Sequence, residues 1–499
     1  MRGSLGFMLF QLDRESRVPL HEQVRAQVAL HIDQGNLRPG SRLPPTRRLA
    51  GSLGINRSTV CRAYQDLWAQ GYLEARPGAY STVRARLRTT TNKASLRPSC
   101  LAFERLSAPA PRRLFSQVGR MAHLAAMADD LRLVNFASLA ADRELCPSEE
   151  LQRAFRKVIT MRGKTVFDYG HPAGYRPLRE SIAVNLRVHG VAVTADEILV
   201  TNGSQHGFDL LLRLFARPGA AVAMEAPTYS LAIMSCRQQS IPIAAVAMRA
   251  DGMDLAALEG HLRSRAIAFV YTMPNFQNPT GITTSQVHRE RLLGLCEAHG
   301  VPLVEDGFEE ELKYFGHAVL PIKSMDNKGV VIYLGTFSKV VFPGLRVGWI
   351  AAPPDCIERL VAISRVCWLS GNVLTQAAVS RFCDSGAFEE HVRRVHRTYR
   401  PRMRALLDGL DDRMPKERVT WSRPQGGYAL FMQVHPRGKM SEEVAMERIR
   451  AAGVLVSPGS LYFPSPPKQV CFRLSIANLS PEKIAEGCRR LGKALKGMV

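Results

Sequence analysis

The chain has 499 residues, 46% hydrophobic and 22% charged, a balance typical of a soluble globular protein with room for two or three domains. No apolar stretch reaches the roughly 20 residues of a membrane span. The start of the chain lacks the features of a signal peptide, and no two of the ten cysteines are spaced as Cys-x-x-Cys. We therefore expect a cytoplasmic protein with reduced thiols, no metal site and no contact with a membrane. The net charge of +23 suggests a polyanionic partner, although a basic surface that binds nothing would look the same.

The N-terminal region shows three helical patterns followed by a hairpin. Apolar residues recur every four positions over residues 19–34, which predicts an amphipathic helix. A second, short helix is expected from about Pro45, and a third with Asn56 or Ser58 as its N-cap. Residues 71–83 alternate around a Pro-Gly turn, as a small hairpin does. This order of elements predicts a winged helix-turn-helix, whose third helix would enter the major groove of DNA.

Charge supports a DNA-binding role for this region. Residues 1–90 contain 14 arginines, no lysine and 6 acidic residues, for a net charge of +8. Arginine contacts to phosphate give affinity for DNA, and bidentate contacts to guanine give specificity. A pair of solvated basic helices is the alternative.

The motifs of this region resemble the GntR-type winged helix. They are Leu43-Pro44-Pro45-Thr46-Arg47, Leu49-Ala50, Gly54-Ile55-Asn56-Arg57-Ser58-Thr59-Val60 and Gly71-Tyr72-Leu73. The resemblance implies that double-stranded DNA is contacted by Arg47, Arg57, Thr59, Arg62 and Gly78, the last at the tip of the wing. Cys61 stands where that family often has an arginine, and the adjacent Arg62 is a candidate substitute.

Composition changes after the hairpin. Residues 86–125 are rich in Arg, Thr, Ser, Pro and Ala, which predicts a flexible basic linker between a DNA-binding domain of residues 1–85 and a third region of residues 126–499. An ordered, extended arm packed on the third region is the alternative.

From about residue 165, short apolar strands alternate with helices, which predicts a mostly parallel α/β sheet. Four motifs follow strands, where such sheets bind ligands. Gly203-Ser204-Gln205 opens a helix and could cradle an anion. Asn278 could hold a ligand oxygen, and Asp306 could keep a heterocyclic nitrogen protonated. Lys339, among small hydroxyl residues, is a candidate Schiff-base nucleophile. Taken singly, each motif also has a purely structural interpretation, as a turn, a strand end or a surface lysine.

Together the four motifs resemble the aminotransferases of pyridoxal 5'-phosphate (PLP) fold type I. Lys339 lies 33 residues after Asp306, and Arg346 lies 7 residues after Lys339, the spacing that family leads one to expect. The resemblance covers about residues 165–480. It implies a smaller C-terminal α+β subdomain beside the main sheet and, as cofactor, PLP joined to Lys339 as an internal aldimine.

The resemblance also assigns roles to other residues. Asp306 would hold the pyridinium nitrogen, Asn278 the ring hydroxyl and Tyr229 the ring face, while Arg473 would grip a substrate carboxylate. The phosphate would lie near Ser204, Gln205, Thr336, Ser338 and Arg346. The segment from Tyr169 to Gly174 resembles a loop that reaches a partner subunit. Phe308 departs from the family, because many relatives have there a tyrosine that bonds the ring oxygen.

A GntR-type winged helix fused to an aminotransferase-like domain is the architecture of MocR-type transcription regulators. The resemblance implies a head-to-tail homodimer that binds a DNA operator and senses PLP, or an amino compound, through an aldimine at Lys339. The alternative is an active aminotransferase, acting on an amino acid and a 2-oxo acid, that carries a DNA-binding module. A DNA-binding protein with an inactive cofactor fold is disfavoured, because Lys339 and Asp306 are both present.

Overall fold

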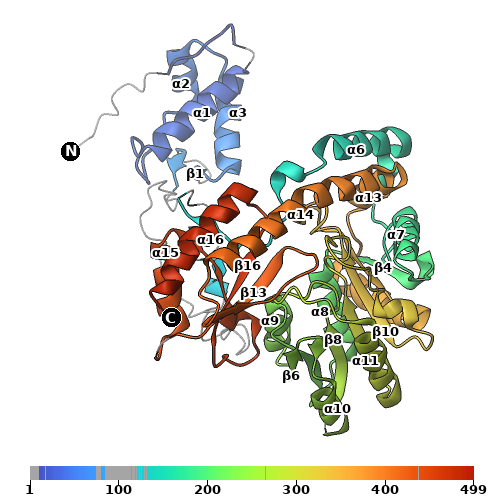
Figure 1. The fold of residues 1–499 in the computed structure, drawn as a ribbon. Coiled ribbons are helices and arrows are strands. Elements are labelled where there is room, and N and C mark those ends of the chain that lie inside the picture. Colours follow the sequence, from blue (N-terminus) through green and yellow to red (C-terminus); the bar gives the residue numbers. More distant parts are fainter. Residues whose placement is uncertain are drawn as a thin grey trace. The chain divides into compact units, whose positions relative to one another are not determined.

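The structure is a computed structural model. It describes residues 10–16, 18–74, 80–84, 132–264, 266–436 and 438–498, together with Asp130 and eight residues between 114 and 127. The chain divides into two compact units, Met1–Ala102 and Phe103–Val499, and each is described by itself (Figure 1). The predicted domain boundaries at residues 85 and 125 fall on or beside residues outside the described part, and they stay predictions.

The smaller unit has the predicted order of elements. It contains α1 (Leu20–Asp33), α2 (Thr46–Leu53), α3 (Arg57–Ala69), β1 (Leu73–Glu74) and β2 (Thr82–Val83), with β1 and β2 paired antiparallel. The side chain of Asn56 accepts a hydrogen bond from the Ser58 amide at 3.1 Å, so Asn56 is the N-cap of α3. A core of apolar residues from all three helices, including Val28, Leu49 and Val60, holds the unit together. The predicted hairpin turn with Gly78 lies outside the described residues.

The larger unit is built on an eight-stranded sheet in the order β4-β11-β10-β9-β8-β5-β6-β7. The pairings β10–β9, β9–β8, β8–β5 and β5–β6 are parallel, whereas β11 and β7 run antiparallel to their neighbours. The strands are β4 (Ile198–Thr201), β5 (Ala221–Ala226), β6 (Ile243–Arg249), β7 (Gly252–Met253), β8 (Ile267–Thr272), β9 (Leu303–Asp306), β10 (Val331–Thr336) and β11 (Gly348–Ala351). The mostly parallel sheet expected from the sequence is confirmed.

Helices cover both faces of this sheet, so every residue of its central strands β8, β9 and β10 is buried. Alternate strand residues such as Met224, Tyr271 and Leu334 pack with α8 (Ser204–Phe215), α9 (Ser230–Gln238) and α12 (Pro354–Trp368). The intervening residues face the opposite way, toward α7 (Arg176–Val188), α10 (Leu255–Ser264), α11 (Gln286–His299) and α13 (Val373–Asp384). The helix expected to open at Gly203-Ser204-Gln205 begins at Ser204.

A smaller subdomain completes the larger unit. Its sheet has the order β12-β13-β16-β15, from β12 (Val419–Trp421), β13 (Ala429–Val434), β15 (Ser457–Pro458) and β16 (Val470–Ser475). The long helix α14 (Ala387–Arg413) lies beside α16 (Pro481–Lys496) (Figure 1). Strand β3 (Val134–Asn135) pairs with β14 (Val454–Leu455), and the remaining helices are α6 (Ser148–Arg162) and α15 (Glu442–Ala451). Residues near 134 therefore belong to the larger unit, although the sequence showed an alternation of strands and helices only from about residue 165.

Part of the predicted flexible linker is helical. Within residues 86–125 the structure describes six positions between 114 and 124, and all six are helical. Leu114, Val118 and Met121 stand at the i, i+4, i+7 spacing of one helix face, a signal that the composition of the segment obscured. Among the described helices of both units, none is long and apolar enough to cross a membrane.

Candidate cofactor site and DNA-binding face

The site lies where the central parallel strands end. Asp306 is the last residue of β9, Thr336 is the last residue of β10, and Lys339 follows Thr336 by three positions. Tyr229 caps α9 shortly after β5. Parallel strands end at one edge of a sheet, so residues from 229 to 339 converge there. Burial and the charge of Asp306 raise the pKa of Tyr229, whereas the charges of Arg346 and Arg473 lower it, so these side chains lie near one another.

Asp306 is buried and incompletely paired. Its Oδ2 accepts a hydrogen bond from the Tyr271 hydroxyl at 2.7 Å, while Oδ1 has no hydrogen-bond partner among the described residues. Burial raises the pKa of Asp306 to about 6, and the Tyr271 hydroxyl offsets part of that effect. A buried carboxylate oxygen without a donor costs free energy. A protonated ring nitrogen is the donor that would satisfy it, so this residue fits PLP.

Tyr271 is a site residue that the sequence did not reveal. It is the next-to-last residue of the buried strand β8, where a tyrosine ordinarily means only packing. The buried Phe308 contributes no hydroxyl and packs with the apolar side chains between the sheet and α8, α9 and α12. Phe308 thus offers no hydroxyl to the ring oxygen, and the hydroxyl of Tyr271 on β8 is hydrogen-bonded to Asp306.

Lys339 is half-buried, and desolvation lowers the pKa of its amine. Its Nζ donates to the Leu139 carbonyl at 3.2 Å, and its own carbonyl accepts from the Tyr428 hydroxyl at 2.5 Å. A lysine of lowered pKa is more often neutral, and a neutral amine is the form that attacks an aldehyde. This fits the predicted attachment of PLP.

Glu309 is a second residue that the sequence did not reveal. It is 2% exposed, its Oε2 accepts from the Tyr428 amide at 3.2 Å, and its Oε1 has no hydrogen-bond partner among the described residues. Burial raises the pKa of Glu309 to about 7 despite the nearby Lys339 and Arg473, and its anionic form in turn raises the pKa of Lys339. Three consecutive glutamates, Glu309 to Glu311, concealed this residue within what looks like an ordinary charged run.

The predicted phosphate cradle is assembled at the start of α8. Gly203 has a φ of +82°, which turns the chain from β4 into the helix, and Ser204 and Gln205 open the helix with free backbone amides. Arg346 lies against Gly203, since a Cβ on that glycine would come 2.9 Å from Arg346 Nη2. The Arg346 guanidinium also donates to the Asn202 carbonyl. The cradle thus joins a helix N-terminus to a cation, as a phosphate group requires.

Two predicted phosphate ligands are partly engaged with each other. The hydroxyl of Thr336 donates to Ser338 Oγ at 3.0 Å, and the amide of Ser338 donates to Thr336 Oγ1 at 3.1 Å. Gln205 turns its amide nitrogen toward Ser235 Oγ at 2.8 Å, and its Oε1 is buried without a partner among the residues that the structure describes.

Arg473 and Asn278 meet across the two subdomains of the larger unit. Arg473 Nη1 donates to Asn278 Oδ1 at 3.4 Å, and Nη2 donates to the Ala137 carbonyl at 2.6 Å. Its guanidinium stacks 5.2 Å from the centre of the Tyr462 ring, while Nε has no hydrogen-bond partner among the described residues. A planar, buried guanidinium with an unused donor is suited to a carboxylate.

The loop that carries Asn278 is held by buried polar side chains. Glu225 accepts from Gln277 Nε2 at 2.9 Å and from the Thr272 hydroxyl at 2.6 Å. Arg289, which is fully buried, donates from Nη2 to Asn275 Oδ1 at 2.6 Å and to the Pro274 carbonyl at 3.0 Å. These contacts hold the segment that leads into Asn278, because each satisfies groups that would otherwise be buried without partners.

In the smaller unit, the predicted DNA contacts lie on the open side of the helix pair. Arg47, Arg57 and Arg62 are exposed, and none forms an ion pair with any residue that the structure describes; Thr59 is half-buried beside them. The opposite side of α3 is buried through Val60, Ala63, Tyr64 and Leu67. Gly54, with a φ of +61°, makes the turn between α2 and α3. The exposed arginines therefore remain available to an anionic ligand.

The chain belongs to the class I and II aminotransferase family, which it matches over residues 134–491, and it also matches the bacterial regulatory proteins of the gntR family over residues 20–89. The first match is wider than the 165–480 recognised by motif. A gntR-type region ahead of an aminotransferase region is the arrangement of the MocR-type regulators, and the chain is of this type.

Individual relatives are of two kinds. The chain is 38% identical over 372 residues to 2-aminoadipate transaminase of Thermus thermophilus, a match that spans 74% of this chain and 91% of that protein. It is 29% identical over 492 residues to the probable rhizopine catabolism regulatory protein MocR of Rhizobium meliloti, a match that spans 97% of this chain and 95% of that one.

Among solved structures, LysN, the α-aminoadipate aminotransferase of Thermus thermophilus complexed with N-(5'-phosphopyridoxyl)-L-leucine, has a TM-score of 0.72 and 34% identity. It covers 80% of this chain and 99% of its own. The fold of the larger unit is thus a PLP-dependent fold, as the motifs predicted.

Proposed function

We propose that this protein binds double-stranded operator DNA through α2 and α3 and that PLP, or an amino compound that reacts with PLP, controls this binding at Lys339. One observation carries the proposal. The regulator MocR matches 97% of this chain and the transaminase 74% of it, and the aminotransferase family match begins at residue 134, after α1 to α3. The exposed arginines of the smaller unit and the half-buried Lys339 of the larger one therefore serve one regulator, acting in the cytoplasm.

The residues of the larger unit divide the work of binding the effector. PLP supplies an aldehyde for reversible attachment to amines and a ring that withdraws electrons. Asp306 would hold the proton of the ring nitrogen, Tyr229 would cover the ring face, and Asn278 would orient the ring oxygen. The α8 cradle with Arg346 would bind the phosphate. Arg473 would bind the carboxylate of an amino-acid effector, and that charge pairing favours amino acids over simple amines.

Two of these side chains contact the same backbone segment. Arg473 donates to the carbonyl of Ala137, and Lys339 donates to the carbonyl of Leu139. This segment follows β3 and lies on the path toward the N-terminal region. A ligand that engages Lys339 or Arg473 removes one of these hydrogen bonds. An effector changes DNA affinity only if it favours one conformation over another, and this segment supplies a contact that differs between the two states.

The test is a titration of operator DNA with and without PLP, repeated with a panel of amino acids and simple amines. We expect PLP, or PLP with one amine, to shift DNA affinity by about 1–3 kcal/mol, the usual range of allosteric coupling. DNA must then shift the affinity of the ligand by the same factor. Lys339→Ala should abolish a borohydride-reducible adduct and the shift together. The proposal is wrong if no ligand changes DNA affinity in the wild-type protein.

An active aminotransferase is the second candidate. It is favoured by the site itself, since the half-buried attachment lysine shares one site with the buried ring-nitrogen carboxylate and the buried carboxylate-binding arginine. Measurement of turnover separates the two candidates. An enzyme would convert many equivalents of amino acid and 2-oxo acid per site, whereas a regulator would convert few or none.

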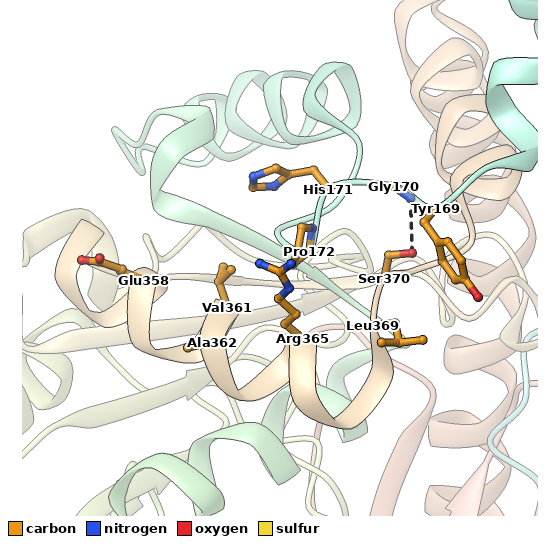
Figure 2. A pocket seen from close by; sticks show the side chains of 10 residues that line it. All are labelled: Tyr169, Gly170, His171, Pro172, Glu358, Val361, Ala362, Arg365, Leu369 and Ser370. Carbon is orange, nitrogen blue, oxygen red and sulfur yellow. Dashed lines mark hydrogen bonds between the residues drawn. The ribbon is translucent and has the colours of Figure 1, made fainter.

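We further propose that the larger unit forms a head-to-tail homodimer through the loop at Tyr169. Tyr169 is 80% exposed, Val366 86% and Leu369 59%, and such large apolar side chains are seldom left together in water. Tyr169 and Leu369 line a cavity of about 660 Å³, in which Gly170 donates to Ser370 Oγ at 3.3 Å (Figure 2). Tyr169→Asp with Val366→Asp should give a monomer in analytical ultracentrifugation. A dimer of unchanged stability would contradict this assignment of the interface.

A further inference from the structure

The solvent face of α14 carries a row of arginines that the cofactor site does not use. Arg393, Arg397, Arg400 and Arg404 are spaced by four, three and four positions, so they lie within one narrow stripe of the helix. All four are exposed. The row spans about 16 Å along the helix axis at roughly 1.5 Å per residue.

Two other arginines of α14 are neutralised by ion pairs, whereas the four arginines of the row have none among the described residues. Arg402 is paired with Asp142 at 2.6 Å, and Arg394 with Glu150 at 3.3 Å. No ion pair joins any arginine of the row to an acidic residue in the part of the chain that the structure describes. An uncompensated row of like charges opposes folding through self-repulsion, and an external polyanion would relieve it.

Part of the row is also held in place. The guanidinium carbons of Arg400 and Arg404 lie 5.6 Å and 6.0 Å from the centre of the Phe315 ring, close enough for cation–π attraction. A groove of about 570 Å³ runs beside them, lined by Arg397, Arg400, Pro401, Arg404, Ala405 and Asp408. Asp408 is the single carboxylate in this lining, so the groove keeps a net positive charge. Ordered cations lose less conformational entropy on binding than freely moving ones.

We propose that the arginine row of α14 binds the phosphate backbone of duplex DNA as a second contact outside the winged helix. DNA is favoured over other polyanions because this chain already carries a DNA-binding region. Residues beyond 90 hold +15 of the total charge of +23, so the excess is not confined to that region. A row about 16 Å long covers the axial rise of roughly five base pairs, so its arginines can reach several phosphates. The contact is independent of base sequence, and the inference rests on the proposed DNA binding.

The experiment uses the full-length protein and a mixed-sequence duplex of about 60 base pairs, so that phosphate contacts alone are measured. The variant is R397Q/R400Q/R404Q. The matched control is R187Q/R217Q/R291Q, which removes the same charge from exposed arginines without ion pairs elsewhere in the described part of the larger unit. Near-ultraviolet circular dichroism and the PLP absorbance band check that both variants are folded.

We expect the slope of log affinity against log salt to become shallower by about 2.7 in the row variant, from 0.9 per phosphate contact, and to change little in the control. A lysine variant, R397K/R400K/R404K, should keep most of the slope. Equal slopes for the row variant and the control would overturn the inference. So would loss of binding to phosphatidylserine vesicles with DNA binding unchanged, since the row would then serve a membrane. If the Gln variant does not fold, Arg397→Gln alone should change the slope by about 0.9.

The outcome is separable from the proposed function. Arg57→Ala tests the winged helix. If this variant loses operator binding while the row variant keeps the salt slope of the wild-type protein, the proposed function stands and the second DNA contact is ruled out.

Discussion

Arg289 is the residue whose removal should disturb the cofactor site most from a distance. It lies on α11, is fully buried, and makes hydrogen bonds to the Thr284 hydroxyl at 2.9 Å and the Leu320 carbonyl at 2.7 Å, besides those to Pro274 and Asn275. Arg289→Met keeps much of the side-chain length but removes every donor. Two buried acceptors at the start of the Asn278 loop then lose a charged partner.

Hydrogen bonds to a charged group contribute about 1.5–3 kcal/mol each. Two buried acceptors that lose such a partner therefore give a destabilisation of about 3–6 kcal/mol. The carbonyl of Leu320 adds little, because that residue is half-exposed and water can replace the arginine. PLP should also bind more weakly, since the loop that holds Asn278 loses an anchor.

The assay is urea unfolding followed by near-ultraviolet circular dichroism, with PLP affinity measured by absorbance. Arg291→Met is the matched control, because it makes the same chemical change on the exposed side of the same helix and should stay within about 0.5 kcal/mol of wild type. If both variants unfold at the same urea concentration with equal slopes, the buried network does not hold this loop.

Three further predictions concern single side chains. Arg57→Ala should weaken operator binding by about 1–3 kcal/mol if Arg57 contacts a base, and normal binding by gel shift would contradict the role assigned to α3. The pKa of Asp306 is raised from 3.8 to about 6 in the folded protein. As the pH rises through that window, ionisation of Asp306 therefore lowers the free energy of unfolding of the PLP-free protein, by about 3 kcal/mol at 1.36 kcal/mol per pKa unit. Asp306→Asn should remove this loss of unfolding free energy between pH 4 and pH 7 while weakening PLP binding, and identical pH profiles would refute it. Glu309→Gln removes an anion near Lys339 and should lower the pKa of that amine further. A pH titration of the rate of PLP attachment would then have its midpoint at lower pH. An unchanged midpoint would show that Glu309 has no electrostatic effect on Lys339.

Local sequence motifs predicted the two-part architecture, and their resemblance to known families predicted the cofactor. The winged-helix motifs are local, since α2, α3 and the turn at Gly54 fall within about 25 residues, and short-range patterns specify such elements. The PLP motifs are local too. Each is a strand followed by a polar residue, and parallel strands bring those residues to one edge without further information.

Which other side chains reach this edge of the sheet depends on the tertiary structure. Tyr271 pairs with Asp306 across 35 positions, and Arg473 reaches Ala137 across 336 positions. Glu309 becomes a buried neighbour of Lys339 only after the smaller subdomain supplies Tyr428. On α14 the sequence shows many arginines, but only folding brings Asp142 to Arg402 and leaves the outer row unpaired among the described residues. Contacts between distant segments depend on how strands and helices pack, and no local pattern records them.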